Sequence, residues 1–214
     1  MILHAHPLSS FCWKVLIALY EKEISFEQRM ADVGSAEGRA AFAALWPIAK
    51  MPVLEDAGRV VPETSIIIEY LDRLHPQPPR LIPGEAEAAQ AVRLADRIYD
   101  LYVQVPMQKI VADRLRPAGA RDAYGVAEAR RLLETGCGLV DRDLAERAFA
   151  AGEAFSLADC AAMPALFYAD KVMPLAERFG AAAAYLERMK ERPSFARVLR
   201  EAEPWFRYFP EEER

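Results

Sequence analysis

A proline-rich segment between residues 75 and 84 divides this chain into two parts with different hydrophobic patterns. Proline cannot continue a helix and restricts the residue before it to extended backbone, so four prolines in this segment predict a linker. Before it, short apolar runs alternate with amphipathic stretches, whereas after it apolar residues recur at helical spacing. The sequence therefore predicts an α/β domain at residues 1–75, a linker at 76–84 and an all-helical domain at 85–214.

The first part predicts the element order β-α-β-α-β-β-α. A turn containing Gly58 separates two short apolar runs, which is typical of a hairpin, and Glu63 with Thr64 then opens an amphipathic helix. The expected elements are strands at residues 2–5 and 25–30, helices at 10–21 and 35–45, a hairpin at 51–61 and a helix from residue 63.

The second part predicts helices alone. Pro106 interrupts a long apolar stripe that resumes beyond it, which indicates a kinked helix. Gly136 and Gly138 stand inside another helix at a cost of about 1 kcal/mol each relative to alanine, which indicates close packing against a neighbour. Ser156 and Asp159 have the spacing of a capping box at a helix start. The expected helices lie at residues 85–115, 121–149, from 157 onward, 181–191 and 194–201.

Charge and composition argue against several classes of partner. The 214-residue chain has a net charge of −5 and no basic run, so nucleic acid and anionic membranes are poor partners. No apolar stretch is long enough to span a bilayer, and the first residues lack a signal-peptide pattern. The three cysteines are scattered, and neither they nor the three histidines have metal-ligand spacing. We therefore expect a cytoplasmic protein without a metal or a disulfide framework.

A pair of hydroxyls lies where the first strand gives way to the first helix. Ser9 and Ser10 follow a short apolar run, and the spacing from Ser9 to Cys12 is that of a C-x-x-C redox motif with serine in the first position. Helix N-termini offer unpaired N–H groups and a partial positive charge, which favour a bound thiolate. Serine is equally a favoured helix cap, so the residues alone leave both a structural and a chemical role open.

Together with the domain order, five pieces of the sequence resemble the cytosolic glutathione transferases over the whole chain. The first piece is similar to the serine-type members, including the zeta group of maleylacetoacetate isomerases. The five pieces are residues 9–15, the loop at 47–52, Glu63 and Thr64 heading a helix, the proline-rich linker, and residues 155–159. The resemblance implies a thioredoxin-like α/β domain followed by an all-α helical bundle, with glutathione as co-substrate and no metal.

The resemblance assigns the glutathione-binding side chains. Met51 and Pro52 match the cis-proline turn whose backbone meets the cysteinyl part of glutathione. Lys50 is expected to pair with the glycyl carboxylate. Glu63 is expected to meet the α-ammonium group, and Thr64 at the helix N-terminus to bind the γ-glutamyl carboxylate.

The resemblance also assigns the chemistry to Ser9, with Ser10 as the alternative donor. Lowering a thiol pKa from about 8.5 to about 6.5 requires ~2.7 kcal/mol of preferential thiolate stabilisation. A hydrogen bond from a hydroxyl to a charged sulfur contributes roughly 1.5–3 kcal/mol, and the helix N-terminus about 0.3–1 kcal/mol. A small electrophile would bind between the domains, with Tyr102, Met107 and Tyr168 as candidates for the wall that faces Ser9. The aromatic segment at residues 204–209 would cover this cleft or pack on the first domain.

Three positions depart from the zeta pattern. Cys12 replaces a serine and is expected to pack as a small apolar residue; Trp46 replaces a common asparagine, and Glu63 a common glutamine. We therefore expect a homodimeric glutathione S-transferase of the detoxification type, which conjugates or transfers glutathione to a small electrophile. The alternatives are a maleylacetoacetate-type isomerase, a thiol-disulfide reductase that uses Cys12, and a non-catalytic glutathione- or ligand-binding protein.

Overall fold

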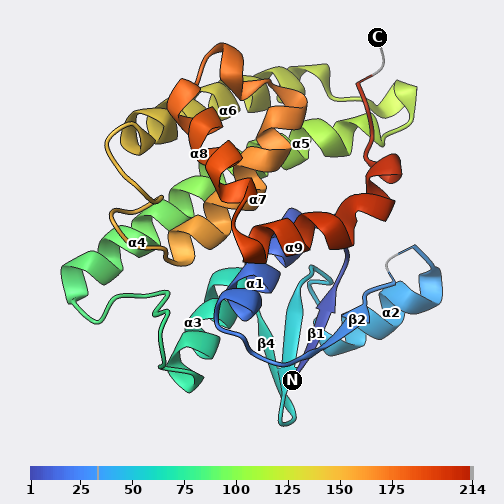
Figure 1. The fold of residues 1–214 in the computed structure, drawn as a ribbon. Coiled ribbons are helices and arrows are strands. Elements are labelled where there is room, and N and C mark those ends of the chain that lie inside the picture. Colours follow the sequence, from blue (N-terminus) through green and yellow to red (C-terminus); the bar gives the residue numbers. More distant parts are fainter. Residues whose placement is uncertain (33, 213–214) are drawn as a thin grey trace.

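One mixed four-stranded sheet forms the core of the first domain in the computed structural model, which describes residues 1–32 and 34–212 (Figure 1). The strand order is β2-β1-β3-β4, in which β1 runs parallel to β2 and antiparallel to β3. Leu3 is fully buried at the centre, where it pairs with Gln28 on one side and Leu54 on the other. The strands are β1 (Ile2–Ala5), β2 (Glu27–Met30), β3 (Val53–Asp56) and β4 (Arg59–Pro62).

Three helices belong to this domain: α1 (Ser10–Glu21), α2 (Ala36–Leu45) and α3 (Thr64–Leu74). Ser9 caps α1 and Ser35 caps α2, each by accepting a backbone N–H from three residues ahead. Helix α1 is buried over most of its length because it packs within the core that continues into the second domain. Helix α2 packs over a separate small core around Phe42 and Val53.

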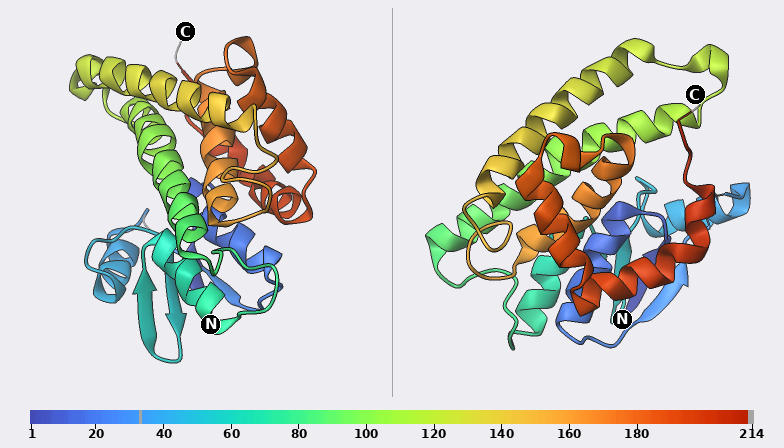
Figure 2. Two further views of the ribbon diagram at one scale, coloured as in Figure 1. Left: turned by 90° about the vertical axis from the view of Figure 1, so that its left-hand side faces the viewer. Right: turned by 45° about the horizontal axis from the view of Figure 1, so that its top comes forward.

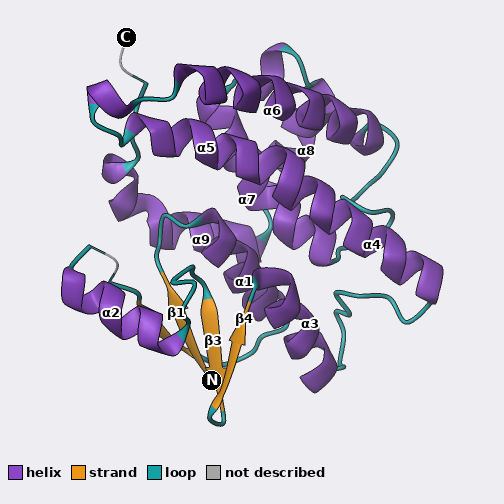
Figure 3. Cartoon of the chain, turned by 180° about the vertical axis from the view of Figure 1, so that it is seen from behind, coloured by secondary structure: helices purple, strands orange, loops and turns teal. Residues whose placement is uncertain are grey.

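The remaining helices form the second domain, apart from the strands (Figure 3). The rod that begins at Ala86 leans across the first domain, and α9 crosses over α1 (Figure 2). The segments are α4 (Ala86–Ile98), the π-helix η1 (Tyr99–Gln104), α5 (Val105–Arg114), η2 (Ala118–Ala120), α6 (Ala123–Leu144), α7 (Leu157–Val172), η3 (Leu175–Glu177), α8 (Gly180–Lys190), α9 (Pro193–Ala202) and η4 (Glu203–Tyr208). The predicted fold class and element order are confirmed.

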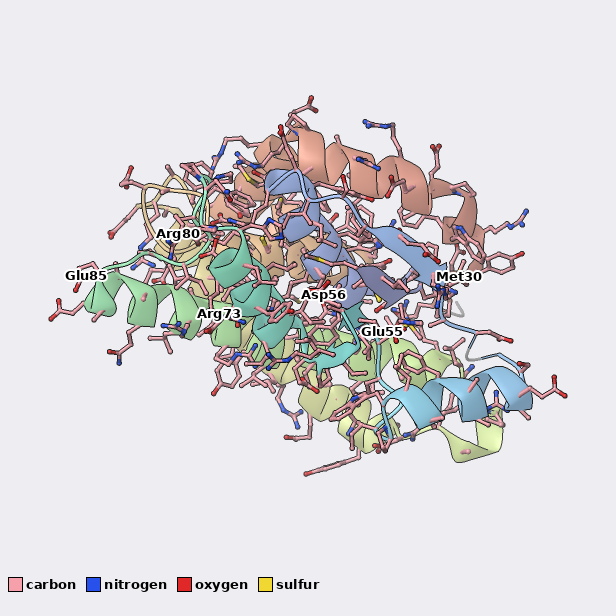
Figure 4. The ribbon with its side chains drawn as sticks, turned by 90° about the horizontal axis from the view of Figure 1, so that it is seen from below. Met30, Glu55, Asp56, Arg73, Arg80 and Glu85 are labelled. Atoms are coloured by element: carbon pink, nitrogen blue, oxygen red, sulfur yellow. The ribbon has the colours of Figure 1, made fainter. Side chains whose placement is uncertain are left out.

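The predicted linker falls between two of these elements. Helix α3 ends at Leu74 and α4 begins at Ala86, and Arg80 and Glu85 lie along the segment that leads into α4 (Figure 4). The domain boundaries themselves stay a prediction. Among the helices that the structure describes, none combines the length and the apolar character needed to cross a membrane.

The rod from α4 to α5 differs in detail from the predicted kink at Pro106. A π-helical turn precedes this proline, and the Val105 N–H donates to the carbonyl of Asp100, five residues earlier. Pro106 has no N–H for the carbonyl of Tyr102, four residues earlier, so the ordinary helical pattern cannot continue there. The π-turn therefore accommodates the proline within one continuous rod.

Gly136 permits a close approach between the backbones of α6 and this rod. A Cβ added at Gly136 would lie 2.2 Å from the carbonyl oxygen of Tyr102, so close packing is confirmed at this position. A Cβ at Gly138 would meet its nearest neighbour, a ring carbon of Phe179, at an ordinary 3.7 Å. The prediction of close packing was wrong for Gly138, where a Cβ would make only an ordinary van der Waals contact with the Phe179 ring.

The capping box at the start of α7 is confirmed and extends further than predicted. The Ser156 hydroxyl accepts the Ala158 N–H, and the Asp159 carboxylate accepts the Ser156 N–H. Asp159 also accepts hydrogen bonds from the Ala150 N–H and the Tyr185 hydroxyl. Because Asp159 is fully buried, this carboxylate anchors three separate segments of the helical domain.

The aromatic C-terminal segment packs on the first domain and also against α7 of the second domain. The ring of Trp205 meets His6 at 5.4 Å, and Phe209 meets Tyr168 at 5.6 Å. Beyond them, Glu212 pairs with Arg114 at 3.0 Å and with Arg130 at 2.7 Å.

Candidate active site

A cavity of about 680 Å³ lies between the two domains. It contains all five residues that were predicted to bind glutathione: Lys50, Met51, Pro52, Glu63 and Thr64. The second domain contributes side chains from α4, η1 and α5: Arg93, Asp96, Arg97, Asp100, Leu101, Val105 and Gln108.

The N-terminus of α3 is open toward this cavity. Glu63 precedes the helix with φ of 68°, in the left-handed region, and its side chain makes no capping hydrogen bond. Strained backbone of this kind clusters at functional sites. Because Thr64 at the first helical position also lines the cavity, N–H groups and a hydroxyl are available there for an anionic group.

The turn before β3 forms the opposite side of the cavity. The Met51–Pro52 peptide bond is cis, as the resemblance implied. Lys50 is exposed, and among the described residues neither Lys50 nor Glu63 forms an ion pair. The cavity thus offers one cation and one anion without a direct ion pair, the anion lying near enough to Arg97 to help raise the pKa of that guanidinium, together with an open helix terminus.

A second cavity of about 420 Å³ adjoins the first at the mouth of α1. Ser10 lines the second cavity and Phe11 the first, while Gln108 lines both. The other lining residues are Leu8, Ser9, Met107, Val111, Ala112, Leu115, Tyr168, Tyr208, Phe209 and Pro210. None of these side chains is charged, so the second cavity is suited to an uncharged, largely apolar group.

The predicted wall residues separate into two groups. Met107 and Tyr168 line the second cavity opposite the serine pair, and the Tyr168 hydroxyl donates to the carbonyl of Leu8 at 2.9 Å. Tyr102 lines neither cavity, because its part of the rod faces Gly136 of α6. The C-terminal segment contributes Tyr208, Phe209 and Pro210 to this wall.

Each hydroxyl of the serine pair accepts one hydrogen bond from the protein. Ser9 Oγ accepts the Cys12 N–H at 3.3 Å, and Ser10 Oγ accepts from Gln104 Nε2 at 2.5 Å. Within residues 1–32 and 34–212, the Ser10 hydroxyl donates no hydrogen bond to a protein group, whereas the Ser9 hydroxyl also faces the Cys12 sulfur and lowers the pKa of that thiol. Ser10 therefore retains its proton for a bound acceptor, and the proton of Ser9 faces a thiol sulfur, which is only a weak acceptor.

Cys12 is fully buried in α1, as predicted for a packing residue. Burial raises the pKa of its thiol to about 11, although the side chain of Ser9 and the His6 N–H, whose nitrogen lies 3.5 Å from the sulfur, both donate to it. A thiol with these properties is protonated at neutral pH and inaccessible, which are the opposite of the properties of a redox cysteine.

A buried ion cluster joins the domains at the floor of the first cavity. Lys14 Nζ lies 2.5 Å from Asp96 Oδ1, 2.7 Å from Asp100 Oδ2 and 3.0 Å from Ser65 Oγ. Half-exposed Arg97 contacts Asp96 at 2.8 Å and Asp100 at 2.5 Å. Desolvation raises the pKa of Asp100, and the charge of Lys14 opposes that rise.

Sequence reasoning missed this cluster, together with Gln104 and Gln108. The available signal was Lys14, a lysine within the apolar run from Trp13 to Tyr20. A buried lysine requires acidic partners, but nothing local to α1 showed which carboxylates these would be.

The thioredoxin-like sheet, the helical bundle and the two adjoining cavities define a glutathione-transferase type of molecule. Comparison with family models matches residues 3–79 to the glutathione S-transferase N-terminal domain and residues 123–188 to the C-terminal domain. This chain belongs to the glutathione S-transferase family, and the predicted family is confirmed.

Three similar proteins illustrate the range of the family. FtsZ-localized protein A of Caulobacter vibrioides is 31% identical over 212 residues, which are 95% of this chain and 91% of the relative. A probable maleylacetoacetate isomerase of Vibrio cholerae is 28% identical over 95% of this chain and 97% of its own length. A glutathione S-transferase of Methylobacillus flagellatus, solved with glutathione bound, superposes with a TM-score of 0.85 at 27% identity, covering 92% of this chain and 98% of its own.

Proposed function

We propose that this chain binds glutathione in the first cavity and transfers it to a small, uncharged electrophile in the second. The observation that carries the proposal is the complementarity between glutathione and the groups of the first cavity that form no direct ion pair. Lys50 pairs with the glycyl carboxylate and Glu63 with the α-ammonium group. Thr64 and the N-terminus of α3 bind the γ-glutamyl carboxylate, and the backbone of Met51 meets the cysteinyl part.

The sulfur of a ligand held in this way reaches the serine pair at the junction of the cavities. Ser9 turns its proton from the weakly accepting Cys12 thiol to the charged thiolate, and the N-terminus of α1 adds its partial positive charge. No metal and no general base is needed for this step. The thiol releases its proton to water as the thiolate forms. The thiolate sulfur then bonds to the ring carbon of an aryl halide held against Met107 and Tyr168, and the carbon–halogen bond breaks with release of the halide ion.

The role of Ser9 in stabilising the thiolate is tested by ultraviolet absorbance titration of bound glutathione. Ser9→Ala is expected to raise the thiol pKa by about 1–2 units, the loss of one charge-assisted hydrogen bond. Because Ser9 also caps a helix, the matched control is Ser35→Ala, which removes a cap outside both cavities and should leave the thiol pKa unchanged. An unchanged titration in Ser9→Ala would contradict the assignment.

The γ-glutamyl site is tested by calorimetry. Thr64→Ala is expected to weaken glutathione binding with little effect on the pKa of the bound thiol, because Thr64 is assigned to the far end of the ligand. Equal affinities of Thr64→Ala and wild type would exclude this role.

The uncharged second cavity bears on the choice of reaction. A maleylacetoacetate isomerase handles a dicarboxylate, and no charged side chain lines the second cavity. We therefore favour conjugation over isomerisation. Turnover of an uncharged aryl halide, with none of maleylacetoacetate, is the expected outcome; the reverse pattern would favour the isomerase.

A non-catalytic partner-binding role is the second candidate, because the similarity to FtsZ-localized protein A extends over nearly the whole chain. Absence of glutathione binding by calorimetry, together with co-sedimentation with FtsZ polymers, would establish this role instead.

A homodimer and a cytoplasmic location complete the proposal. Four exposed apolar side chains support the dimer, because they line the first cavity where a second copy could cover them: Ile48, Ile66, Leu101 and Val105. Sedimentation velocity and cell fractionation test these two points.

A further inference from the structure

Two buried polar contacts join α1 to the π-helix η1 in a ladder with equal spacing. Ser10 and Lys14 are four residues apart on α1, and Asp100 and Gln104 are four residues apart on η1. Lys14 pairs with Asp100 at 2.7 Å, and Gln104 donates to Ser10 at 2.5 Å. Because all four residues are buried, the ladder fixes the start of α1 against the second domain.

The π-turn holds in place the two residues that η1 contributes to the ladder, Asp100 and Gln104. The bond from the Val105 N–H to the carbonyl of Asp100 sets the wider turn, and Gly136 of α6 contacts the turn from behind at Tyr102. Turns of this kind often occur at functional sites in helices. Asp100 and Gln104, which η1 directs at α1, each bind a polar side chain of α1 beside the two cavities.

The side chain of Gln104 is unfavourable for stability, because part of its amide is buried without a partner in the part of the chain that the structure describes. Its side chain is 2% exposed, and its Oε1 is buried without a hydrogen-bond partner among the described residues. A buried, unpaired carbonyl oxygen costs free energy, and an apolar side chain of similar shape would avoid that cost. The amide is therefore better explained by what its Nε2 does for Ser10.

We propose that Gln104 is a positioning residue, which holds the Ser10 hydroxyl as a second hydrogen-bond donor to the glutathione sulfur. This inference rests on the proposed function and adds to it. By accepting from Gln104, Ser10 Oγ keeps its own proton for the cavity, and a hydroxyl that accepts one hydrogen bond donates a stronger one. Ser9 and Ser10 then both stabilise the thiolate.

The test replaces Gln104 with methionine, which keeps the length of the side chain and removes the amide. Gln104→Met is expected to raise the thiol pKa of bound glutathione by about 0.5 unit, which is roughly a threefold fall in the acid dissociation constant of the thiol. The thermal midpoint is expected to stay equal or to rise, because the unpaired oxygen disappears. Gln90→Met, at an exposed position of α4, is the matched control and should change neither quantity.

A double-mutant cycle shows whether Gln104 acts through Ser10. In a Ser10→Ala background, Gln104→Met should no longer change the thiol pKa, whereas in a Ser9→Ala background its effect should persist. Equal effects in both backgrounds would overturn the proposal. An unchanged thiol pKa with a lower thermal midpoint would show a merely structural residue.

Two further outcomes are equally decisive. A fall of the thiol pKa in Gln104→Met would mean that the amide oxygen takes the Ser10 proton, which overturns the proposal. A wild-type protein that binds glutathione without forming thiolate, or does not bind it, refutes the proposed function itself. The latter failure is seen before any Gln104 variant is measured.

Discussion

Replacement of Gly136 and of Gly138 by alanine should have opposite effects on stability, although the two residues lie on the same helix. In Gly136→Ala the new Cβ would lie 2.2 Å from the carbonyl oxygen and 2.8 Å from the carbonyl carbon of Tyr102. Ordinary carbon–oxygen contacts begin at about 3.3 Å, so the helices would have to separate by roughly 1 Å. Backbone atoms cannot rotate away as a side chain could.

The magnitude follows from two opposing terms. Overpacking costs about 1–3 kcal/mol, and contact with backbone puts Gly136→Ala at the upper end of that range. Alanine returns about 1 kcal/mol of helix propensity, so the net destabilisation is about 2 kcal/mol. In Gly138→Ala the nearest neighbour lies at 3.7 Å, and the propensity gain of about 0.5–1 kcal/mol remains.

Urea unfolding of the two variants and of wild type measures this difference. We expect Gly136→Ala to lie about 3 kcal/mol below Gly138→Ala, with thermal midpoints on opposite sides of wild type by a few degrees. Equal stabilities of the two variants would refute the argument, because they would show that α6 and η1 do not approach at Gly136.

Three more outcomes are expected. Lys14→Met should cost about 3 kcal/mol in urea unfolding, the lower end for a broken buried pair, because the two buried carboxylates keep only the half-exposed Arg97 as a charged partner. Lys109→Met, which breaks an exposed pair, should cost less than about 1 kcal/mol. Since the Asp100 carboxyl has a raised pKa and is easier to protonate without Lys14, the deficit of Lys14→Met should shrink as the pH falls; a pH-independent deficit would be evidence against burial of the charge. Asp159→Ala should cost more than the 0.5–2 kcal/mol of a lost cap, about 3 kcal/mol, because buried donors are also left unpaired; thermal unfolding at the wild-type midpoint would contradict this. Iodoacetamide should label native Cys12 no faster than the protein unfolds, since the buried thiol has a pKa of about 11; rapid labelling in a mass-spectrometric time course would restore the reductase hypothesis.

Local signals in the sequence predicted most of the fold. Serines at the starts of α1 and α2, the turn at Gly58 and the capping box at Ser156 mark element ends through bonds within a few residues. The π-turn before Pro106 was missed because a proline inside an apolar stripe indicates an irregularity without showing its form.

The part of the candidate site that lies on turns and helix starts of the first domain was predictable. Lys50 and Thr64 each stand at a turn or helix start that has its own sequence signature, and the structure brings both to one cavity. The contacts of α1 with the second domain were not predictable. Gln104 lies 94 residues from Ser10, and Asp100 lies 86 residues from Lys14, so only the packing of the two domains brings these pairs together.

The cluster around Lys14 also limits how the two domains can be inherited. A helical domain taken from a relative without carboxylates at the positions of Asp96 and Asp100 would seal a lone ammonium group inside the molecule. A chimera of this kind would fold only if position 14 changed with its partners. The two domains of this chain are therefore not interchangeable modules: over evolutionary time, the charge on α1 and the acids on the rod from α4 to η1 must be exchanged or retained as one unit.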